Sequence, residues 1–187
     1  MEPLRIRRFS KTDALICDVD GTLVDVRDVR SHVERPAGEV DFKPNYERFH
    51  ADSINSPAHP EVIQLLKHAH ACGLTILIVT GREQKWSFLT TTWLAEHGVP
   101  YDELIMRSRN DPRPDAVVKT EMVRSIALRY NTRLAIDDRP AIVEVWQGAG
   151  IPTALVTASG SLGALEWPAG HEAEDDVQAL VRDALHR

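Results

Sequence analysis

The sequence predicts an α/β fold built on a parallel sheet. Short apolar runs recur along the chain, and amphipathic stretches long enough for helices separate them. Strands that alternate with helices in this way indicate βαβ units, whose strands are parallel. Three of the runs end at Asp or Thr, beside a glycine or a second aspartate. Because ligands of such sheets bind beyond the carboxyl ends of the strands, we expect a site where these runs end.

Five apolar runs are interpreted as strands. The first is closed by Asp20-Gly21 and the second by Thr80-Gly81, and turn residues of this kind favour short strands over buried helices. The five runs cover residues 14–19, 74–79, 104–106, 134–136 and 153–156. Even the longest falls far short of the ~20 apolar residues that cross a bilayer.

Five further segments are interpreted as helices because their apolar residues recur at helical spacing. They cover residues 62–69, 84–97, 117–129, 141–147 and 172–186. Gly73 and Gly98 follow the first two segments and are typical helix stops. In the second segment, Trp86, Phe88 and Trp93 are interpreted as core residues.

Residues 24–57 differ from the rest of the chain. They are rich in charged residues, proline and histidine, and they show little helical or strand period. We therefore expect a flap or small cap inserted after the first strand. No repeat, low-complexity tract or Ser/Gly linker divides the chain, so residues 1–187 are expected to form a single domain with this insertion.

Composition and charge restrict the class of protein. The 187 residues are 43% apolar and 27% charged, as in ordinary soluble globular proteins. A net charge of −6 argues against a non-specific duplex binder with a broad basic face.

The terminus and the cysteines suggest a location. The basic start, with Arg5, Arg7 and Arg8, lacks the apolar stretch of a signal peptide. Cys17 and Cys72 form no spacing motif, which favours reduced cysteines. A cytoplasmic location with no membrane partner is the expectation.

Acidic residues follow two of the predicted strands. Asp18 and Asp20 close the first strand, and Asp137 and Asp138 close the fourth. Carboxylates gathered at one sheet edge repel one another and raise their own pKa values, a conflict that a bound cation removes. Oxygen ligands with room for water and phosphate favour Mg²⁺. The sequence therefore predicts a magnesium site formed by these four aspartates.

Such a site suits phosphate chemistry. Asp18 can attack phosphorus and form an aspartyl-phosphate, while Asp20 protonates the leaving oxygen and later deprotonates water. Thr80 and Lys119 are placed to hold the oxygens that are transferred. Gly21 and Gly81 permit close approach of the backbone to the phosphate.

These motifs resemble those of the haloacid dehalogenase superfamily of aspartate-nucleophile phosphatases. They occur in the order of that superfamily, as Asp18-x-Asp20-Gly21-Thr22, Thr80, Lys119 and Asp137-Asp138. The resemblance covers residues 14–156 and implies a Rossmann-like sheet of strand order 5-4-1-2-3 flanked by helices. It also implies that Asp18, the backbone carbonyl of Asp20 and Asp137 ligate Mg²⁺, with Asp138 acting mainly through water.

A narrower resemblance is to the 3′-phosphatase half of phage polynucleotide kinase-phosphatases. It rests on Thr80-Gly81-Arg82-Glu83, Arg113 to Lys119, Leu134 to Arg139 and Val143 to Trp146. It implies phosphate- or substrate-binding roles for Arg82 and Asp115, beside the loop residues Gly21, Thr22 and Gly81. A further family arginine follows the first motif by about eleven residues; Arg27 and Arg30 bracket that position, and the choice between them stays open.

The predicted function is that of a Mg²⁺-dependent phosphatase that removes 3′-terminal phosphates from DNA or RNA. The alternatives are a small-molecule or nucleotide phosphatase of the same superfamily, or a phosphate-binding module without turnover. No Gly-x-x-x-x-Gly-Lys-[Ser/Thr] motif occurs in the sequence, so a polynucleotide kinase or ligase, if one cooperates, is expected as a separate partner. The preference for DNA or RNA and the oligomeric state stay open.

Overall fold

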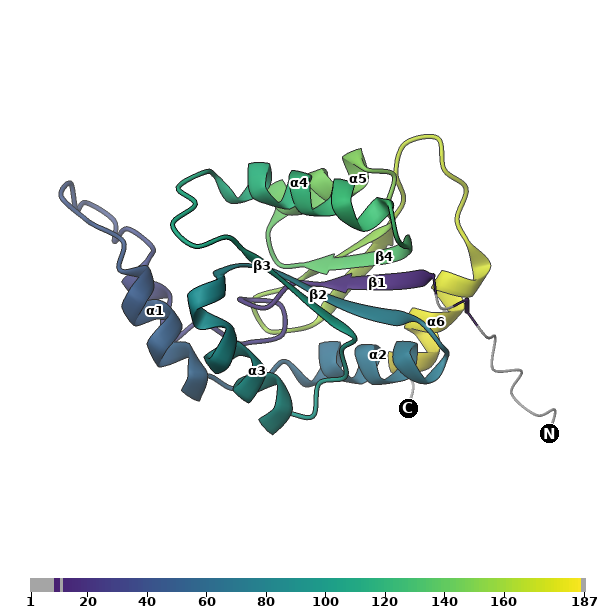
Figure 1. The fold of residues 1–187 in the computed structure, drawn as a ribbon, viewed down its shortest axis with the longest axis horizontal. Coiled ribbons are helices and arrows are strands. Elements are labelled where there is room, and N and C mark those ends of the chain that lie inside the picture. Colours follow the sequence, from purple (N-terminus) through teal and green to yellow (C-terminus); the bar gives the residue numbers. More distant parts are fainter. Residues whose placement is uncertain (1–8, 11, 186–187) are drawn as a thin grey trace.

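A six-stranded sheet forms the centre of the protein in the computed structural model, which describes residues 9–10 and 12–185 (Figure 1). Its strands are β1 (Asp13–Cys17), β2 (Thr75–Glu83), β3 (Glu103–Arg107), β4 (Asn131–Asp137), β5 (Thr153–Val156) and β6 (Leu162–Glu166). They lie in the order β3-β2-β1-β4-β5-β6. The first five are parallel, so the α/β class and the order 5-4-1-2-3 are confirmed. The sixth strand, β6, was not predicted; it adds antiparallel to β5 at the sheet edge.

The central strand β1 is covered on both faces, and all five of its residues are buried. Leu15 and Cys17 join the larger core cluster on one face, whereas Ala14 and Ile16 join the smaller cluster on the other. This alternation follows from the strand geometry, which points successive side chains to opposite faces. Burial on both faces explains why residues 14–17 of β1 are all apolar rather than alternating with polar residues.

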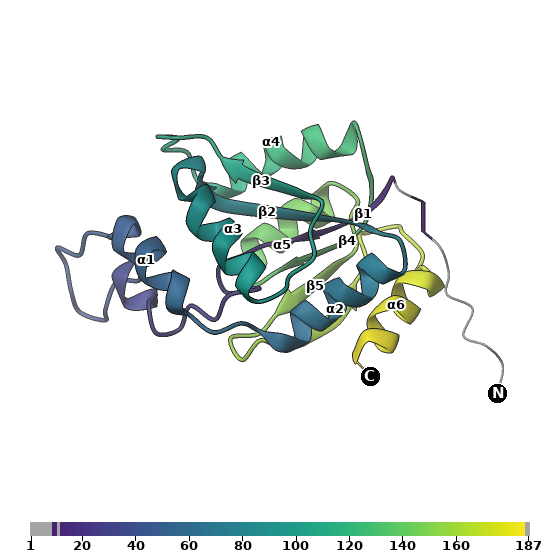
Figure 2. The same ribbon diagram turned by 60° about the horizontal axis from the view of Figure 1, so that its bottom comes forward.

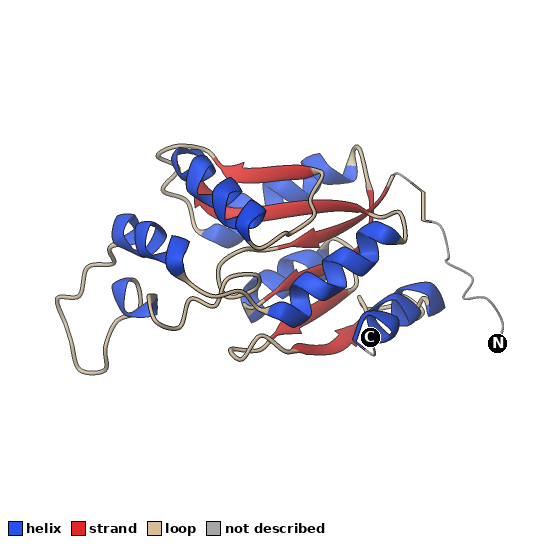
Figure 3. Ribbon diagram, turned by 90° about the horizontal axis from the view of Figure 1, so that it is seen from below, coloured by secondary structure: helices blue, strands red, loops and turns tan. Residues whose placement is uncertain are grey.

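Helices cover the two faces of the sheet (Figures 1 and 3). These are α2 (Pro60–Ala71), α3 (Ser87–Glu96), α4 (Asp115–Ala127), α5 (Pro140–Gly148) and α6 (Asp175–Leu185), whereas α1 (Tyr46–Asp52) lies beyond the strand ends. α4 and α5 pack on the face of the smaller cluster, and α2, α3 and α6 on the other face. α2 and α5 each begin with a proline, whose missing N–H costs nothing in a first helical turn.

Residues 24–57 lie beyond the carboxyl ends of the strands (Figure 2). They hold α1 and the two short 3₁₀ segments η1 (Arg30–His32) and η2 (Ser53–Asn55). Asn45 caps α1 by accepting a hydrogen bond from the Arg48 backbone nitrogen at 2.9 Å. This insertion therefore carries a helix that its irregular sequence did not predict, and it places that helix over the strand ends.

The interpretation of Phe88 as a core residue was wrong. Trp93 is buried at 1% exposure, but Phe88 is 77% exposed. Five residues along a helix correspond to about 140° around its axis, so the two side chains cannot share the buried face. Phe88 lies on the solvent side of α3.

Two sequence expectations concern membranes and the N-terminus. Within the described residues, no helix combines the length and the apolar character that a bilayer span requires. The basic residues Arg5, Arg7 and Arg8 lie outside the described part of the chain.

Candidate active site

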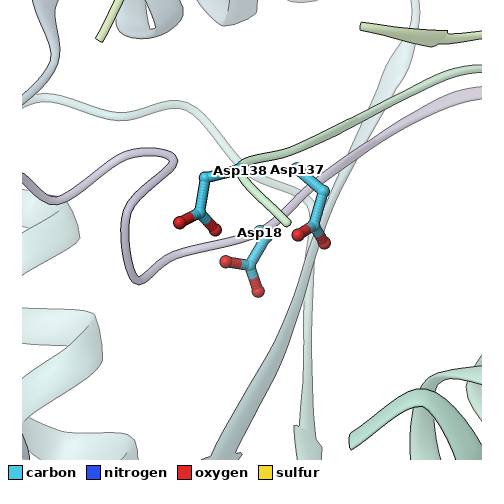
Figure 4. A group of neighbouring side chains, drawn as sticks. All are labelled: Asp18, Asp137 and Asp138. Atoms are coloured by element: carbon cyan, nitrogen blue, oxygen red, sulfur yellow. The ribbon is translucent and has the colours of Figure 1, made fainter. Parts of the chain in front are cut away.

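Three carboxylates converge where β1 and β4 end (Figure 4). Asp18 directly follows β1, Asp137 is the last residue of β4, and Asp138 comes next. One oxygen of each lies within 4.8 Å of the others. The backbone brings them together, because the amide of Asp18 donates to the carbonyl of Ile136 at 3.0 Å and so continues the β1–β4 pairing. The geometry therefore brings together three of the four aspartates that the sequence analysis placed at a metal site, and the Asp20 carboxylate does not join them.

Lys119 lies between two of these carboxylates. Its Nζ donates to Asp18 Oδ1 at 2.7 Å and to Asp137 Oδ2 at 2.8 Å, and its side chain is fully buried. It comes from α4, the helix that precedes β4. The indole of Trp146 lies beside it, with the ring centroid 5.8 Å from Nζ. A buried ammonium needs such partners, and here it neutralises part of the acidic cluster.

Burial dominates the electrostatics of the cluster. Loss of solvent raises the pKa of Asp18 to about 8, and Lys119 opposes this shift only in part. Burial and the neighbouring charge of Asp137 also raise the pKa of Asp138. Burial lowers the pKa of Lys119, but the charges of Asp18 and Asp137 raise it by more, so the lysine stays protonated. Lys119 therefore offsets only part of the cost of ionising these buried carboxylates.

The chemistry of the cluster fits a hard divalent cation. All of its ligand atoms are carboxylate oxygens, which such ions prefer. Asp138 Oδ1 is buried and lacks a hydrogen-bond partner in the described part of the chain, so one ligand atom remains available. Asp18, Asp137 and Asp138 are the residues that would hold the ion.

Asp20, two residues after Asp18, is held by Arg82. The Arg82 guanidinium donates from Nε to Asp20 Oδ2 at 2.8 Å and from Nη2 to Asp20 Oδ1 at 2.5 Å. Arg82 is only 2% exposed, and Ser53 and Thr90 accept its remaining hydrogen bonds. Burial raises the pKa of Asp20, but Arg82 outweighs this effect and brings the pKa below its usual value. Arg82, expected at the substrate, therefore contacts Asp20 directly.

The two glycines of the motifs leave space that other residues would fill. Gly21 has a φ of 89°, and a Cβ there would lie 2.1 Å from Asp138 Oδ2. A Cβ on Gly81 would lie 2.3 Å from Asp115 Oδ1. The adjacent Thr80 accepts a hydrogen bond from the Arg82 backbone nitrogen at 3.1 Å, which leaves its own hydroxyl proton free to donate to a ligand.

A cavity of about 650 Å³ opens over these residues. Asp18, Asp20, Thr80, Gly81 and Asp138 line it together with four arginines. These arginines are Arg30, Arg107, Arg113 and Arg139. Carboxylates and guanidinium groups around one opening can hold a cation and a phosphate side by side.

The remaining predicted residues divide between the cavity and its surroundings. Arg30 lines the cavity and donates from Nη2 to Asp138 Oδ2 at 2.8 Å, whereas Arg27 pairs with Asp25 and is 60% exposed. Asp115 lines the cavity and binds Arg107 at 2.8 Å. Thr22 is fully buried, and its hydroxyl has no hydrogen-bond partner among the described residues.

Arg139, Tyr46 and His50 are among the cavity residues that were given no role from the sequence. Arg139 contacts Asp115, and its place directly after Asp137-Asp138 was a usable signal. Tyr46 and His50 line the cavity from α1, but no motif marked them because the insertion has no period. Burial lowers the pKa of His50 to about 4, so its ring is neutral at pH 7.

Comparison with known proteins shows the family of this chain. The family model described as the phosphatase domain of the polynucleotide kinase PNKP matches residues 12–160. A protein of Autographa californica nuclear polyhedrosis virus, named as a bifunctional polynucleotide kinase/RNA ligase, is 27% identical over 143 residues. That match takes in 75% of this chain but only 18% of the viral protein.

Two solved structures resemble this chain in fold. A chain of the Pnkp1/Rnl/Hen1 complex superposes with a TM-score of 0.63 at 27% identity, over 79% of this chain and 47% of that one. An HAD-like phosphatase of Mesorhizobium loti superposes with a TM-score of 0.60 at 16% identity, over 96% and 88% of the two chains, and this likeness shows the fold alone. The chain thus spans about half the length of the chain it resembles in the complex, and about a fifth of the viral relative.

Proposed function

The chain belongs to the family of polynucleotide kinase phosphatase domains, and on this premise we propose that it is a Mg²⁺-dependent 3′-phosphatase of nucleic acid strands. That it is a phosphatase follows from the family match and from the phosphatase fold. The metal, the 3′ position and the covalent route are the parts that we propose.

One observation carries the proposal: Lys119 Nζ lies between Asp18 and Asp137 at the end of the sheet, 2.7 and 2.8 Å from their oxygens. A buried lysine paired in this way fixes the orientation of the Asp18 carboxylate. It also leaves a positive charge beside the position that a transferring phosphoryl group would occupy. Charge that is already in place stabilises a transition state without the cost of reorganisation.

The first step transfers the phosphoryl group to Asp18. An oxygen of Asp18 forms a bond to phosphorus while the bond between phosphorus and the 3′-oxygen breaks. Asp20 supplies the proton that this leaving oxygen needs, and such general acid catalysis contributes about 10²- to 10⁴-fold. Thr80 and Lys119 hold the oxygens on which negative charge develops.

The second step frees the enzyme. A water oxygen bonds to phosphorus, the bond from Asp18 to phosphorus breaks, and Asp20 takes a proton from the water. The products are a strand with a 3′-hydroxyl and inorganic phosphate. In the resting site Arg82 holds Asp20 ionised, so Asp20 is ready to act as a base. In the first step the negative charge of the bound phosphate raises the pKa of Asp20, against the effect of Arg82, so that Asp20 can carry the proton.

Mg²⁺ is the ion that we assign to the acidic cluster. Carboxylates with room for water and phosphate suit Mg²⁺ better than a fully enclosed calcium site. When bound, it would offset the charge of the phosphate so that an anionic carboxylate can approach. Asp18 and Asp137 are its direct ligands in this proposal, with the Asp20 carbonyl, and Asp138 acts through water.

The relatives support a nucleic acid end as the substrate. They are a viral protein named for a polynucleotide kinase together with an RNA ligase, and chains of complexes that contain Pnkp1 and Rnl. We propose that the chain likewise works with a polynucleotide kinase or ligase. The insertion of residues 24–57 would act as the flap that contacts the strand, since several of its residues line the cavity.

A substrate panel tests the proposal. Phosphate release is measured side by side from an oligonucleotide with a 3′-phosphate, the same oligonucleotide with a 5′-phosphate, free nucleotides and sugar phosphates, with Asp18→Asn as the inactive control. We expect strong preference for the 3′-phosphate. Equal activity on the 5′-phosphate or on sugar phosphates would show a small-molecule phosphatase instead.

A further inference from the structure

His50 lines the cavity and carries a buried nitrogen without a hydrogen-bond partner among the described residues. The side chain comes from α1, is 9% exposed and lines the cavity. Its Nδ1 is buried and has no hydrogen-bond partner in the described part of the chain. The nearest acidic oxygen, Asp20 Oδ2, lies 3.9 Å away, beyond hydrogen-bond distance. Buried polar atoms are nearly always paired, so a ligand in the cavity is the natural partner.

Aromatic rings hold this imidazole in place. The Phe49 ring meets it edge-on with centroids 5.1 Å apart, and the Trp86 ring lies 5.6 Å away. These contacts leave His50 little freedom to turn toward another partner. Its position at the cavity wall is therefore a fixed feature of α1.

Tyr46 continues the same wall toward solvent. It lies one helical turn before His50, and the two ring centroids are 6.4 Å apart. It lines the cavity and is 59% exposed. An exposed aromatic ring at the mouth of a charged cavity offers a flat surface on which a ligand can stack.

Tyr46 is the most exposed of the named residues on this wall, whereas His50, at 9%, is less exposed than Asp20. The side chain of Asp18 is 4% exposed, that of Asp20 19%, and Tyr46 59%, while His50 lies next to Asp20. In the proposed reaction the leaving oxygen must lie beside Asp20, which gives it a proton. The rest of the leaving group therefore extends past His50 toward Tyr46.

We propose that α1 forms the subsite for the terminal nucleoside of the strand, in which His50 Nδ1 hydrogen-bonds a sugar oxygen and Tyr46 stacks on the base. This inference rests on the proposed function and adds the part of the substrate that the insertion recognises. Stacking tolerates every base, so the subsite reads the presence of a nucleoside and not its sequence.

The effects on KM of removing the base and of removing the Tyr46 ring should be coupled. The substrates are a 3′-phosphorylated dinucleotide and the same compound without its terminal base. For the wild type we expect loss of the base to raise KM about tenfold, within the range of one stacking contact. Tyr46→Ala should raise KM for the complete dinucleotide about tenfold as well, but should change KM for the abasic compound less than about twofold.

His50 is tested on both compounds, because both retain the sugar. His50→Phe keeps the ring and removes the polar atom, whereas His50→Asn keeps a polar atom near the place of Nδ1. We expect His50→Phe to lower kcat/KM at least about tenfold on either compound, the scale of a buried hydrogen bond lost, and His50→Asn to recover most of the loss. Thermal unfolding of both variants checks that they fold. Phe88→Ala, which removes an exposed aromatic side chain from α3, is the matched control and should leave kcat/KM unchanged on both compounds.

Two results would overturn the subsite. One is a Tyr46→Ala effect as large on the abasic compound as on the complete dinucleotide. The other is a His50→Asn variant as impaired as His50→Phe. If instead the wild type releases no phosphate from either 3′-phosphorylated compound, it is the proposed function that fails, so the two failures can be told apart.

Discussion

Arg82 and Asp20 form a buried ion pair in which both Asp20 oxygens accept from one guanidinium, at 2.8 and 2.5 Å. The two residues are 62 positions apart and come from the ends of different strands. Lysine could not replace Arg82 here, because an ammonium cannot bind both carboxylate oxygens in one plane. The pair therefore fixes the direction of the Asp20 carboxylate as well as its charge.

Arg82→Lys tests this relationship. We expect kcat to fall about a hundredfold, because misplacement of a catalytic group by an ångström costs about that much. We expect the free energy of unfolding to fall by about 3 kcal/mol, the scale of a broken buried pair. Steady-state kinetics and urea unfolding measure the two effects.

Arg129→Lys is the control for that variant. Arg129 also binds both oxygens of a carboxylate, that of Glu103, but its side chain is 47% exposed. Exposed pairs contribute at most about 1 kcal/mol, so Arg129→Lys should change kcat and the free energy of unfolding little.

The stability deficit of Arg82→Lys should depend on pH. Because the pKa of Asp20 is lowered in the folded state, its pairing stabilises the fold at neutral pH, and this contribution is lost as the pH falls below about 3.8. A deficit of Arg82→Lys that stays constant through that fall would contradict the assignment.

Gly21→Ala should damage the site as well as the fold. Gly21 has a φ of 89°, and an alanine Cβ would lie 2.1 Å from Asp138 Oδ2. Gly38→Ala is matched to it, because Gly38 has a φ of 86° but no atom within 4 Å of the position that an alanine Cβ would take. Both variants should lose about 1–2 kcal/mol from the left-handed backbone. Only Gly21→Ala should lose activity about a hundredfold, since it displaces Asp138; equal loss in both would contradict this.

Metal removal should act on stability as well as on turnover. EDTA is expected to abolish activity and Mg²⁺ to restore it. Mg²⁺ at about 100 times its Kd should also stabilise the fold by about 2.7 kcal/mol. Asp137→Asn should lose most of this stabilisation in a thermal shift assay, whereas Glu172→Gln, at an exposed glutamate ahead of α6, should keep it. Full activity after exhaustive chelation would exclude the metal site.

Strand length should matter little. The chain carries a net charge of −6, and the exposed cations at the cavity are few, chiefly Arg30, Arg113 and Arg139. A few phosphate contacts would lower log K by only about 0.7 each per tenfold rise in salt. A 3′-phosphorylated dinucleotide should therefore be nearly as good a substrate as a longer oligonucleotide. A hundredfold advantage for long strands would show an extended groove.

The strands and the strand-end carboxylates were predictable because their signals are local. β1 is a buried apolar strand followed at once by Asp18, and β4 ends at Asp137, so each motif lay beside the strand that positions it. Parallel pairing then brought the residues together. β6 was missed because Leu162–Glu166 is a half-exposed edge strand that contains a glycine and shows no clear alternation.

The contacts of α1 and Arg82 were not predictable, since they depend on long-range packing. Arg82 lies at the end of β2 and was expected at the phosphate, but Ser53 from the insertion and Thr90 from α3 complete its surroundings and turn it toward Asp20. His50 reaches the cavity only because residues 24–57 fold over the strand ends. Neither placement leaves a pattern in the sequence.

Transfer of a labelled phosphate to Asp18 tests the central claim most directly. Enzyme in excess is mixed with an oligonucleotide that carries a ³²P-labelled 3′-phosphate and is quenched in acid over a series of times, with Asp18→Asn and a 5′-labelled strand as controls. We predict a transient, hydroxylamine-sensitive label on the peptide that contains Asp18, from the 3′-labelled strand alone, and none on Asp18→Asn. Release of labelled phosphate with no label on the protein at any time, or with the label on another residue, would contradict the account.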